Sequence, residues 1–221
     1  MVMNFGLRNA PATFQRMMNK LLRPIKARYG EDVQGYMDDI LIATKDDLTY
    51  HREVVKTVLS AMKENSLFLK PEKCEFEKHR VEYLGILLED GTVQSDPSKI
   101  SGLHEWPTTL KSVKEVRSML GVLRYQRAFI PGFSHIARPL TELLQKNRTF
   151  EWTERCTEAV KELIRLVTTQ LVLIHPDPNK TFELEVDASH YVTGAILFQQ
   201  DERGKPRPIR YSSKTFNDAK R

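Results

Sequence analysis

The residues whose chemistry is plainest are two adjacent aspartates, Asp38 and Asp39, in the stretch GYMDDILIA at 35–43. Neighbouring side chains on a flat strand point to opposite faces, so such a pair cannot serve one site from within a strand. A tight turn between strands over residues 33–36 and 40–43 lets the two carboxylates converge. Convergent carboxylates offer the oxygen ligands that Mg²⁺ prefers. A solvated acidic hairpin turn is the alternative, and the pattern alone does not exclude it.

A basic segment points to a polyanionic partner. The net charge of +5 is unevenly placed, because residues 101–150 hold eight Lys and Arg against three Glu while the flanking parts are balanced. Within this segment Ser112 and Glu115 form a capping box that predicts a helix start. Four residues then follow at spacings that place them on one helix face: Lys114, Arg117, Gly121 and Arg124. A glycine between cations lets a phosphodiester backbone come close. A merely solvated helix face is the alternative.

Composition excludes several other classes of protein. The chain is 40% hydrophobic and 29% charged, which is typical of a packed globular core rather than a disordered tail. The apolar runs are too short to span a bilayer and the first residues lack a signal-peptide layout, so we expect no membrane partner. The two cysteines, Cys74 and Cys156, have no zinc-binding spacing. No P-loop or dinucleotide-binding glycine pattern occurs.

The elements that position these residues mix helical and β patterns, which predicts an α+β fold. Beyond the acidic hairpin, β structure is expected over 81–88 and from 92 onward, with a turn at Asp90-Gly91, and again over 182–186, 194–199 and 208–212. Helices are expected to begin near Asn9, at Asp46 or Asp47, at 96, 112, 136 and 153.

Two details of this pattern are specific enough to test. A loop is expected over 28–32, between the first helix and the acidic hairpin. In the strand over 182–186, Phe182, Leu184 and Val186 alternate with acidic residues, which predicts one buried face.

The motifs, taken in order, resemble the reverse transcriptase of gypsy-type LTR retrotransposons. They are FGLRNAPATFQ at 5–15, YMDD at 36–39, LKPEKC at 69–74, YLG at 83–85, FIPGFS at 129–134, PLTELL at 139–144, FEWT at 150–153 and VDAS at 186–189. This resemblance covers essentially the whole chain. It implies a partial reverse-transcriptase palm over residues 1–92 (its C-terminal part) and a helical thumb over 93–150. The opening strands of a ribonuclease H-like domain would occupy 151–221.

The resemblance also implies a role for each candidate residue. Asp38 and Asp39 match the paired polymerase aspartates that bind Mg²⁺ (with Mn²⁺ as an alternative), Asp38 as direct ligand and Asp39 in support. Asp187 matches the first metal-binding carboxylate of ribonuclease H; a strand-end aspartate that caps a turn is the alternative. The remaining assignments are Phe5 and Gly6 beside the incoming dNTP, Tyr36 and Met37 under the primer end, Leu84 and Gly85 in the primer grip, and Lys114, Arg117, Gly121 and Arg124 on the duplex phosphates.

The chain also departs from the family pattern. The third polymerase carboxylate of the family lies on an earlier strand, and its later ribonuclease H carboxylates fall beyond Arg221, so we expect the chain alone to be a poor polymerase or none. Gln126 stands where a tyrosine is usual, Ala128 where a basic residue is usual, and Arg210 puts a charge inside a strand where the family has a small residue.

The leading hypothesis is therefore a fragment of a retrotransposon RNA-directed DNA polymerase. Its expected partners are an RNA/DNA primer–template duplex, a dNTP and the remainder of a pol polyprotein. The expected location is intracellular, in the cytoplasm or a virus-like particle, with the nucleus left open. Two alternatives remain: a non-catalytic nucleic-acid-binding remnant, and a structural subunit that completes a partner supplying the fingers.

Overall fold

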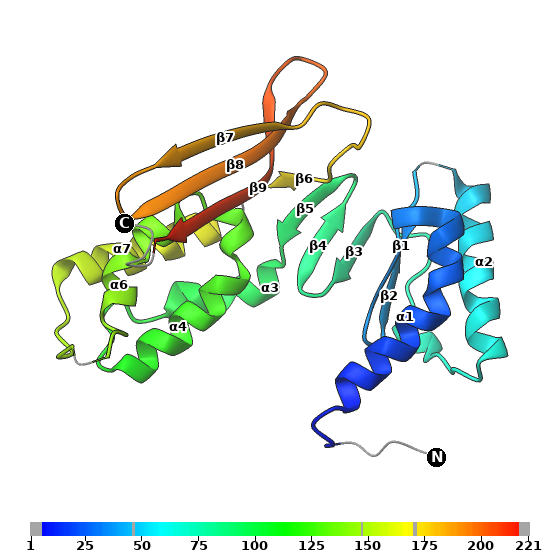
Figure 1. The fold of residues 1–221 in the computed structure, drawn as a ribbon, viewed down its shortest axis with the longest axis horizontal. Helices are drawn as coiled ribbons and strands as arrows, with labels where there is room; N and C mark the ends of the chain where they lie inside the picture. Colours follow the sequence, from blue (N-terminus) through cyan, green and yellow to red (C-terminus); the bar gives the residue numbers. More distant parts are fainter. Residues whose placement is uncertain (1–5, 46, 147, 170–171, 217–221) are drawn as a thin grey trace. The chain divides into compact units, whose positions relative to one another are not determined.

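The protein is described by a computed structural model, which covers residues 6–45, 47–146, 148–169 and 172–216. The chain forms two compact units, Met1–Lys78 and His79–Arg221 (Figure 1). Both combine helices with antiparallel β structure, so the predicted α+β class is confirmed. Within the described ranges, no helix is long and apolar enough to cross a membrane.

The first unit begins with helix α1, Ala10–Tyr29. The loop expected from residue 28 onward is wrong in its start, because the helix continues to Tyr29. Tyr29 is 7% exposed and its ring meets that of Tyr50 edge-on at 6.1 Å, so this contact stabilises the additional residues of the helix. Gly30, with φ of 61°, then ends the helix, and a short 3₁₀ turn over Gly30–Asp32 leads into the hairpin.

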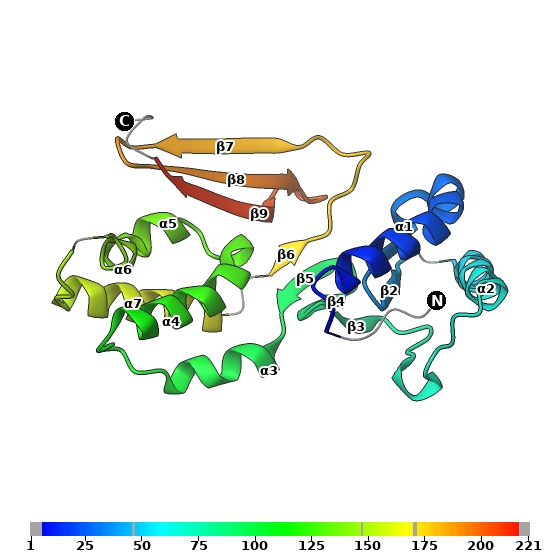
Figure 2. The ribbon, with the colours of Figure 1, turned by 60° about the horizontal axis from the view of Figure 1, so that its bottom comes forward.

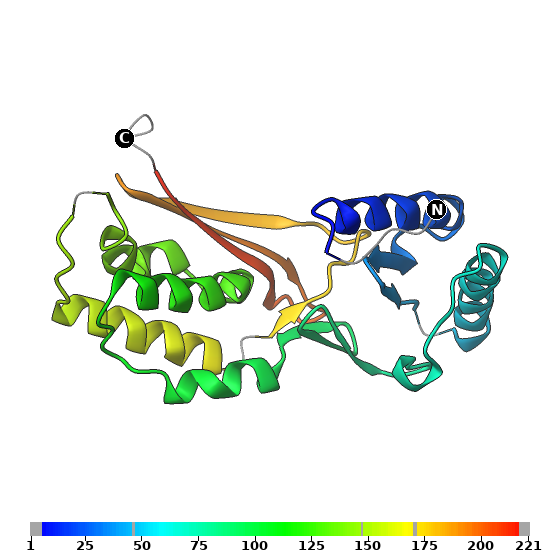
Figure 3. The same ribbon diagram turned by 90° about the horizontal axis from the view of Figure 1, so that it is seen from below.

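The hairpin packs against two helices (Figure 3). It consists of β1, Val33–Tyr36, and β2, Asp39–Ile42, paired antiparallel as predicted. Helix α2, Leu48–Glu64, is capped by Asp47, whose carboxylate accepts from the Tyr50 N–H at 3.0 Å. Asp46, the alternative cap, lies outside the described residues. The buried cluster of this unit comprises Leu22, Ile25, Tyr29, Val33, Val54, Val58 and Met62.

The second unit opens with a four-stranded antiparallel sheet. Its strands are β3 (Arg80–Tyr83), β4 (Ile86–Glu89), β5 (Thr92–Ser95) and β6 (Leu173–Ile174). The continuous extended stretch expected over 81–88 is wrong: the chain turns at Leu84-Gly85, where φ is 48° and 72°. Two successive positive φ values give the tight turn that joins twisted strands. The Asp90-Gly91 turn is confirmed, with φ of 44° and 73°.

A helical layer follows. It comprises α3 (Pro97–Ile100), α4 (Val113–Tyr125), α5 (Phe133–Ile136), α6 (Arg138–Glu142) and α7 (Glu154–Thr168). The helix start expected at 136 is wrong, because α5 ends at Ile136 and a second short helix, α6, begins after Ala137. Pro139 has no N–H to donate to the preceding turn, and its position near the start of α6 suits a new helix rather than the interior of a longer one.

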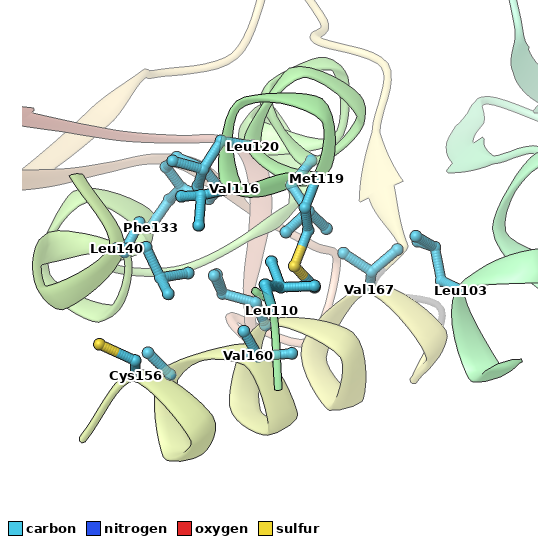
Figure 4. Close-up of a cluster of buried hydrophobic side chains, with 14 of the residues drawn as sticks. Leu103, Leu110, Val116, Met119, Leu120, Phe133, Leu140, Cys156, Val160 and Val167 are labelled. Atoms are coloured by element: carbon cyan, nitrogen blue, oxygen red, sulfur yellow. The ribbon is translucent and has the colours of Figure 1, made fainter. Parts of the chain in front are cut away.

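Helices α4 and α7 share the main buried cluster of the molecule (Figure 4). Met119 and Leu123 of α4, and Val160 and Leu163 of α7, have essentially no exposed surface. Leu103, Phe133 and Leu140 of shorter helical segments, and Leu110 of the segment before α4, also belong to this cluster. This packing fixes the inner face of α4 and leaves its other face to solvent.

The last sheet contains β7 (Glu183–Ala188), β8 (Val192–Gln200) and β9 (Pro206–Thr215) in that order (Figure 2). Ser134 at the start of α5 holds β9: its N–H donates to Ser213 Oγ at 2.9 Å and its Oγ to the Ser213 carbonyl at 3.1 Å. Within the described ranges, α5 packs on β9, and no helix makes a comparably extensive contact with β7. The buried face predicted for 182–186 is therefore wrong: Phe182, Leu184 and Val186 are 47%, 64% and 58% exposed.

Candidate metal and nucleic-acid site

The two aspartates lie at the tip of the first hairpin. Tyr36 pairs with Asp39, so Met37 and Asp38 are the two loop residues of the turn. Of these, only Met37 has a positive φ, 53°, which is the φ pattern of a type II′ turn. Asp38 therefore sits on the turn itself, as the sequence predicted, whereas Asp39, which was expected in the turn, is the first residue of β2.

Both carboxylates face solvent and are available to a ligand. Asp38 and Asp39 are exposed, and neither side chain makes a hydrogen bond or an ion pair with any residue that the structure describes. Exposed carboxylates without protein partners suit a hard cation. Across the described ranges no group of three or more His, Cys, Asp or Glu side chains is arranged to hold a metal. The pair thus fits part of a metal site, with the remaining ligands to come from elsewhere.

A glutamine on α1 holds the turn in place. Gln15 Oε1 accepts from the Met37 N–H at 2.6 Å, and Gln15 Nε2 donates to Asn19 Oδ1 at 2.9 Å. Gln15 Nε2 also lies 3.4 Å from the Gly35 carbonyl oxygen. The sequence reasoning gave Gln15 no role. One signal could have identified it: Gln15 precedes the buried Met18 and Leu22 at helical spacing, so a polar residue stands on the inner face of α1.

Close packing fixes the first strand of the hairpin. A Cβ added at Gly35 would lie 2.5 Å from Leu22 Cδ1, so a larger residue in β1 would require the buried Leu22 side chain of α1 to shift. Beside it, Lys26 Nζ donates to Gln34 Oε1 at 3.0 Å. The hairpin is therefore positioned by a steric contact and by hydrogen bonds on both sides of Gly35.

The other residues predicted around the polymerase site are distributed as follows. Tyr36 is 55% exposed beside the turn, and Met37 is partly buried within it. Gly6 is exposed with φ of 90°, and Phe5 lies outside the described residues. Tyr36 and Met37 thus lie beside the aspartates because they precede them directly in the chain. The Leu84-Gly85 turn belongs to the other unit.

Helix α4 carries the predicted basic face. The predicted capping box is confirmed, because Ser112 Oγ accepts a hydrogen bond from the Glu115 N–H at 3.3 Å. The reciprocal bond to Glu115 Oε2 comes from the N–H of Lys111, at 2.9 Å, rather than from that of Ser112. The helix face carrying Lys114, Arg117, Gly121 and Arg124 is exposed, and these three cations form no ion pair with a carboxylate in the described part of the chain.

Gly121 lies in the middle of this face. A Cβ at this position would meet nothing within 4 Å, so no neighbouring part of the protein requires a glycine there. The residue leaves bare helix backbone between Arg117 and Arg124. Such a face can approach a sugar–phosphate backbone closely.

Asp187 lies on β7 opposite Gly194, and its side chain is exposed. The turn that follows β7 is closed by Ser189, whose Oγ accepts from the Val192 N–H at 3.2 Å and the Tyr191 N–H at 3.4 Å. Ser189 therefore performs the capping that was the alternative role for Asp187. The carboxylate has no hydrogen bond or ion pair within the described ranges.

Two family descriptions match the chain. Residues 1–88 match "Reverse transcriptase (RNA-dependent DNA polymerase)" and residues 152–221 match "RNase H-like domain found in reverse transcriptase". Among similar proteins, the Pol polyprotein from transposon 297 of Drosophila melanogaster is 36% identical over 98% of this chain. The transposon Tf2-3 polyprotein of Schizosaccharomyces pombe is 34% identical over 99% of it. The chain spans only 20% and 16% of these two polyproteins.

Solved structures show the same fold. A foamy viral protease–reverse transcriptase in complex with RNA/DNA hybrid has a TM-score of 0.78, with 21% identity, over 99% of this chain and 29% of that one. The same kind of protein in complex with dsDNA has a TM-score of 0.79 with 22% identity, over 98% of this chain and 44% of that one. The predicted reverse-transcriptase fold is thereby confirmed.

Proposed function

The chain matches a reverse transcriptase domain and an RNase H-like domain and is similar to retrotransposon Pol polyproteins. We infer that it is part of an RNA-directed DNA polymerase and that its two units have different functions in that enzyme. In this proposal the unit Met1–Lys78 supplies carboxylates to the polymerase centre, and the helical layer of the other unit holds the primer–template duplex. In this proposal residues 1–92 form part of the palm, residues 93–150 form the thumb, and residues 151–221 form the RNase H-like part.

The single observation that carries the proposal is the acidic turn. Asp38 and Asp39 are exposed, free of described protein partners and held at the tip of a hairpin by Gln15. Enzymes of these families generally use a divalent metal, and Mg²⁺ supplies charge stabilisation to the attacking and leaving oxygens of nucleotidyl transfer. Asp38 would bind the metal directly, with Asp39 in support. Gly6 and Phe5 would lie beside the dNTP.

The nucleic acid would be held by charge and by close approach. Lys114, Arg117 and Arg124 would contact backbone phosphates, and Gly121 would let the duplex lie against the helix. Tyr36 and Met37 would support the primer end, and the Leu84-Gly85 turn would act as the primer grip. Solved structures of the same fold hold RNA/DNA hybrid or dsDNA, which supports a duplex as the partner. On β7, Asp187 would be a metal ligand of the RNase H-like part.

Binding of Mn²⁺, followed by electron paramagnetic resonance, tests the acidic turn without requiring activity. Asp38→Asn should weaken Mn²⁺ binding most, and Asp39→Asn less. Asp90→Asn is the matched control, because Asp90 is also an exposed aspartate of a two-residue turn but is assigned no metal. Equal Mn²⁺ affinity of the wild type, Asp38→Asn and Asp39→Asn would overturn the metal role.

Primer extension tests the catalytic role. With Mg²⁺, a dNTP and an RNA template carrying a DNA primer, any incorporation by the chain should be abolished by Asp38→Asn and kept by Asp90→Asn. Since the described residues provide only part of a ligand set, the expected rate for the chain alone is low. Incorporation that persists in Asp38→Asn would remove the acidic turn from the mechanism.

A second candidate function is duplex binding without chemistry. The observation that favours it is the cation face of α4, which needs no metal and is complete within one helix. It predicts salt-dependent binding of a duplex that is weakened by Arg117→Ala and Arg124→Ala and is indifferent to Asp38→Asn. If duplex binding is present while Mn²⁺ binding and incorporation are both absent, this second function replaces the first.

A further inference from the structure

A groove runs along the solvent side of helix α2 in the first unit. It is lined by residues of α2 between His51 and Lys63 and by Phe76 and Glu77 of the segment that follows the helix, and its volume is about 390 Å³. A space of this size lies in the range of ligand-binding pockets. The lining includes none of the residues assigned to the acidic turn or to the basic face of α4. The groove is therefore separate from the sites described above.

An ion pair joins the two sides of the groove. Arg52 on α2 donates from Nε to Glu77 Oε1 at 2.6 Å and from Nη2 to Glu77 Oε2 at 3.1 Å. Glu77 has a positive φ of 54°, so the chain turns at this residue. A two-bond contact between a planar guanidinium and a carboxylate orients both groups. The pair therefore helps to keep the neighbouring Phe76 beside α2.

The lining is mostly apolar although it faces solvent. Leu59 is 36% exposed, Phe76 is 51% exposed, and Val55 is partly buried. Because Val55 and Leu59 are four residues apart, they lie on one face of α2, and Phe76 lines the same groove from the other side. Apolar side chains gathered in one groove, rather than scattered singly over a surface, are typical of a binding site.

The charge along this groove is positive. Lys56 and Lys63 are exposed, and their spacing of seven residues places them on one face of α2. Neither forms an ion pair with a carboxylate among the residues that the structure describes. Arg52 and Glu77, in contrast, neutralise each other. Two uncompensated positive charges beside an apolar lining match a ligand that is apolar and negatively charged.

We propose that this groove binds an acidic peptide segment of another protein. Apolar side chains of the segment would contact Leu59 and Phe76, and its carboxylates would pair with Lys56 and Lys63. From His51 to Lys63 the helix advances about 18 Å, which is the length of about five or six extended residues. A nucleic acid would meet only two lysines and would lay a polar backbone on an apolar lining, so it suits the groove less well. This inference does not rest on the proposed function.

Fluorescence anisotropy of a labelled peptide tests the groove. The probe is a fluorescein-labelled eight-residue peptide in which leucine and glutamate alternate, so that all leucines lie on one side of the extended chain. Leu59→Ala should weaken its binding about tenfold, because an apolar contact is lost. Lys56→Glu and Lys63→Glu should each weaken it about fivefold, and less at high salt. The same peptide with lysine in place of glutamate should bind more weakly to the wild type.

Two matched controls lie on α1 of the same unit, outside the groove. Met17→Ala removes an apolar side chain that is 41% exposed, and Lys20→Glu reverses the charge of an exposed lysine. Both variants should bind the peptide as the wild type does. Because Leu59, Lys56 and Lys63 are also exposed, their variants should fold, and the urea midpoint of unfolding verifies this for each.

The outcomes separate a peptide from other occupants. The proposal is overturned if the wild type does not bind the peptide, or if Leu59→Ala and Lys56→Glu bind it as well as Met17→Ala and Lys20→Glu do. It is also overturned if a 20-nucleotide single-stranded DNA displaces the peptide and Lys56→Glu weakens binding of that DNA equally, since the groove then belongs to nucleic acid. Sedimentation that shows a wild-type dimer lost in Leu59→Ala would instead assign the groove to a second copy of the chain.

Discussion

The acidic turn of the first unit and the basic face of the second use different means to present charge. Asp38 sits on a two-residue turn and Asp39 directly after it, and a hydrogen bond from the Met37 N–H to Gln15 Oε1 holds this turn in place. The cations of α4 stand on a regular helix whose opposite side is buried in a large apolar cluster. The turn depends on a few exact contacts, whereas the helix face depends only on α4 remaining packed.

This difference follows from the chemistry proposed for each region. Metal-dependent catalysis is sensitive to small displacements of a ligand, so the carboxylates need a rigid support. Phosphate contacts act over longer distances and tolerate mobile side chains. Substitutions near the turn should therefore change metal binding before stability, and substitutions under α4 should change stability before duplex binding.

The largest effect is expected in the cluster under α4. Leu163→Ala removes a fully buried side chain of α7 and should destabilise the second unit by about 2–5 kcal/mol. Tryptophan fluorescence during urea unfolding measures this, because Trp106 and Trp152 both lie in that unit. Leu22→Ala, which opens the core of the first unit, is the control. If Leu22→Ala shifts the tryptophan transition as much as Leu163→Ala, the two regions are not independent.

Two glycines give the next contrast. Gly35→Ala places a Cβ 2.5 Å from Leu22 Cδ1 and should destabilise the hairpin by about 1–3 kcal/mol while weakening Mn²⁺ binding. Gly121→Ala meets no atom within 4 Å and should stabilise α4 by about 0.5–1 kcal/mol while reducing duplex affinity. Chemical denaturation together with the two binding assays measures both. A stabilising Gly35→Ala would show that the hairpin is not pressed against α1.

Much of the fold could be predicted because local signals agreed with the final structure. The hairpin turn at Asp38, the cap at Asp47, the capping box at Ser112 and the turn at Asp90-Gly91 each depend on residues close in sequence, and the structure confirms them. Of the predictions that failed, the end of α1 and the burial over 182–186 depended on distant contacts, whereas the turn at Leu84-Gly85 and the helix break at Ala137 are local features. The extension of α1 to Tyr29 requires the ring of Tyr50, a contact that no local pattern reveals.

The support of the candidate site was harder to foresee than its carboxylates. An acidic pair in a short hairpin can be recognised from residue type and spacing alone. The role of Gln15 depends on how the hairpin docks on α1, and that arrangement is tertiary. The same holds for β7, where alternation predicted the strand but could not tell which helices would cover it. Periodicity indicates that a face is apolar, and only packing decides whether it is buried.

A smaller effect is expected when the hydrogen bond to the turn is removed. Gln15→Leu deletes the acceptor of the Met37 N–H and should destabilise the first unit by about 0.5–1.5 kcal/mol. The same substitution should weaken Mn²⁺ binding by a larger free energy than it destabilises the unit. The turn keeps both carboxylates, but they are no longer held in a fixed position. Gln15→Glu, which restores an acceptor, serves as the comparison. An unchanged Mn²⁺ affinity in Gln15→Leu would mean that the turn holds its own shape.

The smallest effect on stability is expected from one surface ion pair in each unit. The pH dependence of unfolding shows whether the pair stabilises or destabilises the folded protein. The hydrogen bond from Arg52 to Glu77 lowers the pKa of Glu77 below its ordinary 4.5, and that from Arg165 does the same for Glu162. A carboxyl whose pKa is lower in the folded state stabilises the protein above its unfolded pKa, and this contribution is lost as pH falls through the folded value. Both pairs are largely exposed, so the contribution is small and screened by salt.

Substitution of each acid distinguishes the two pairs. Glu77→Gln breaks a contact between α2 and the segment after residue 73, whereas Glu162→Gln breaks a contact within one turn of α7. The urea midpoint of each variant should fall below that of the wild type near neutral pH and approach it as the pH falls through the lowered pKa of the wild-type carboxyl. Because the Glu77 pair joins segments distant in sequence, its loss should shift the midpoint more than loss of the Glu162 pair. A difference that grows at low pH would contradict the assigned direction of the pKa shift.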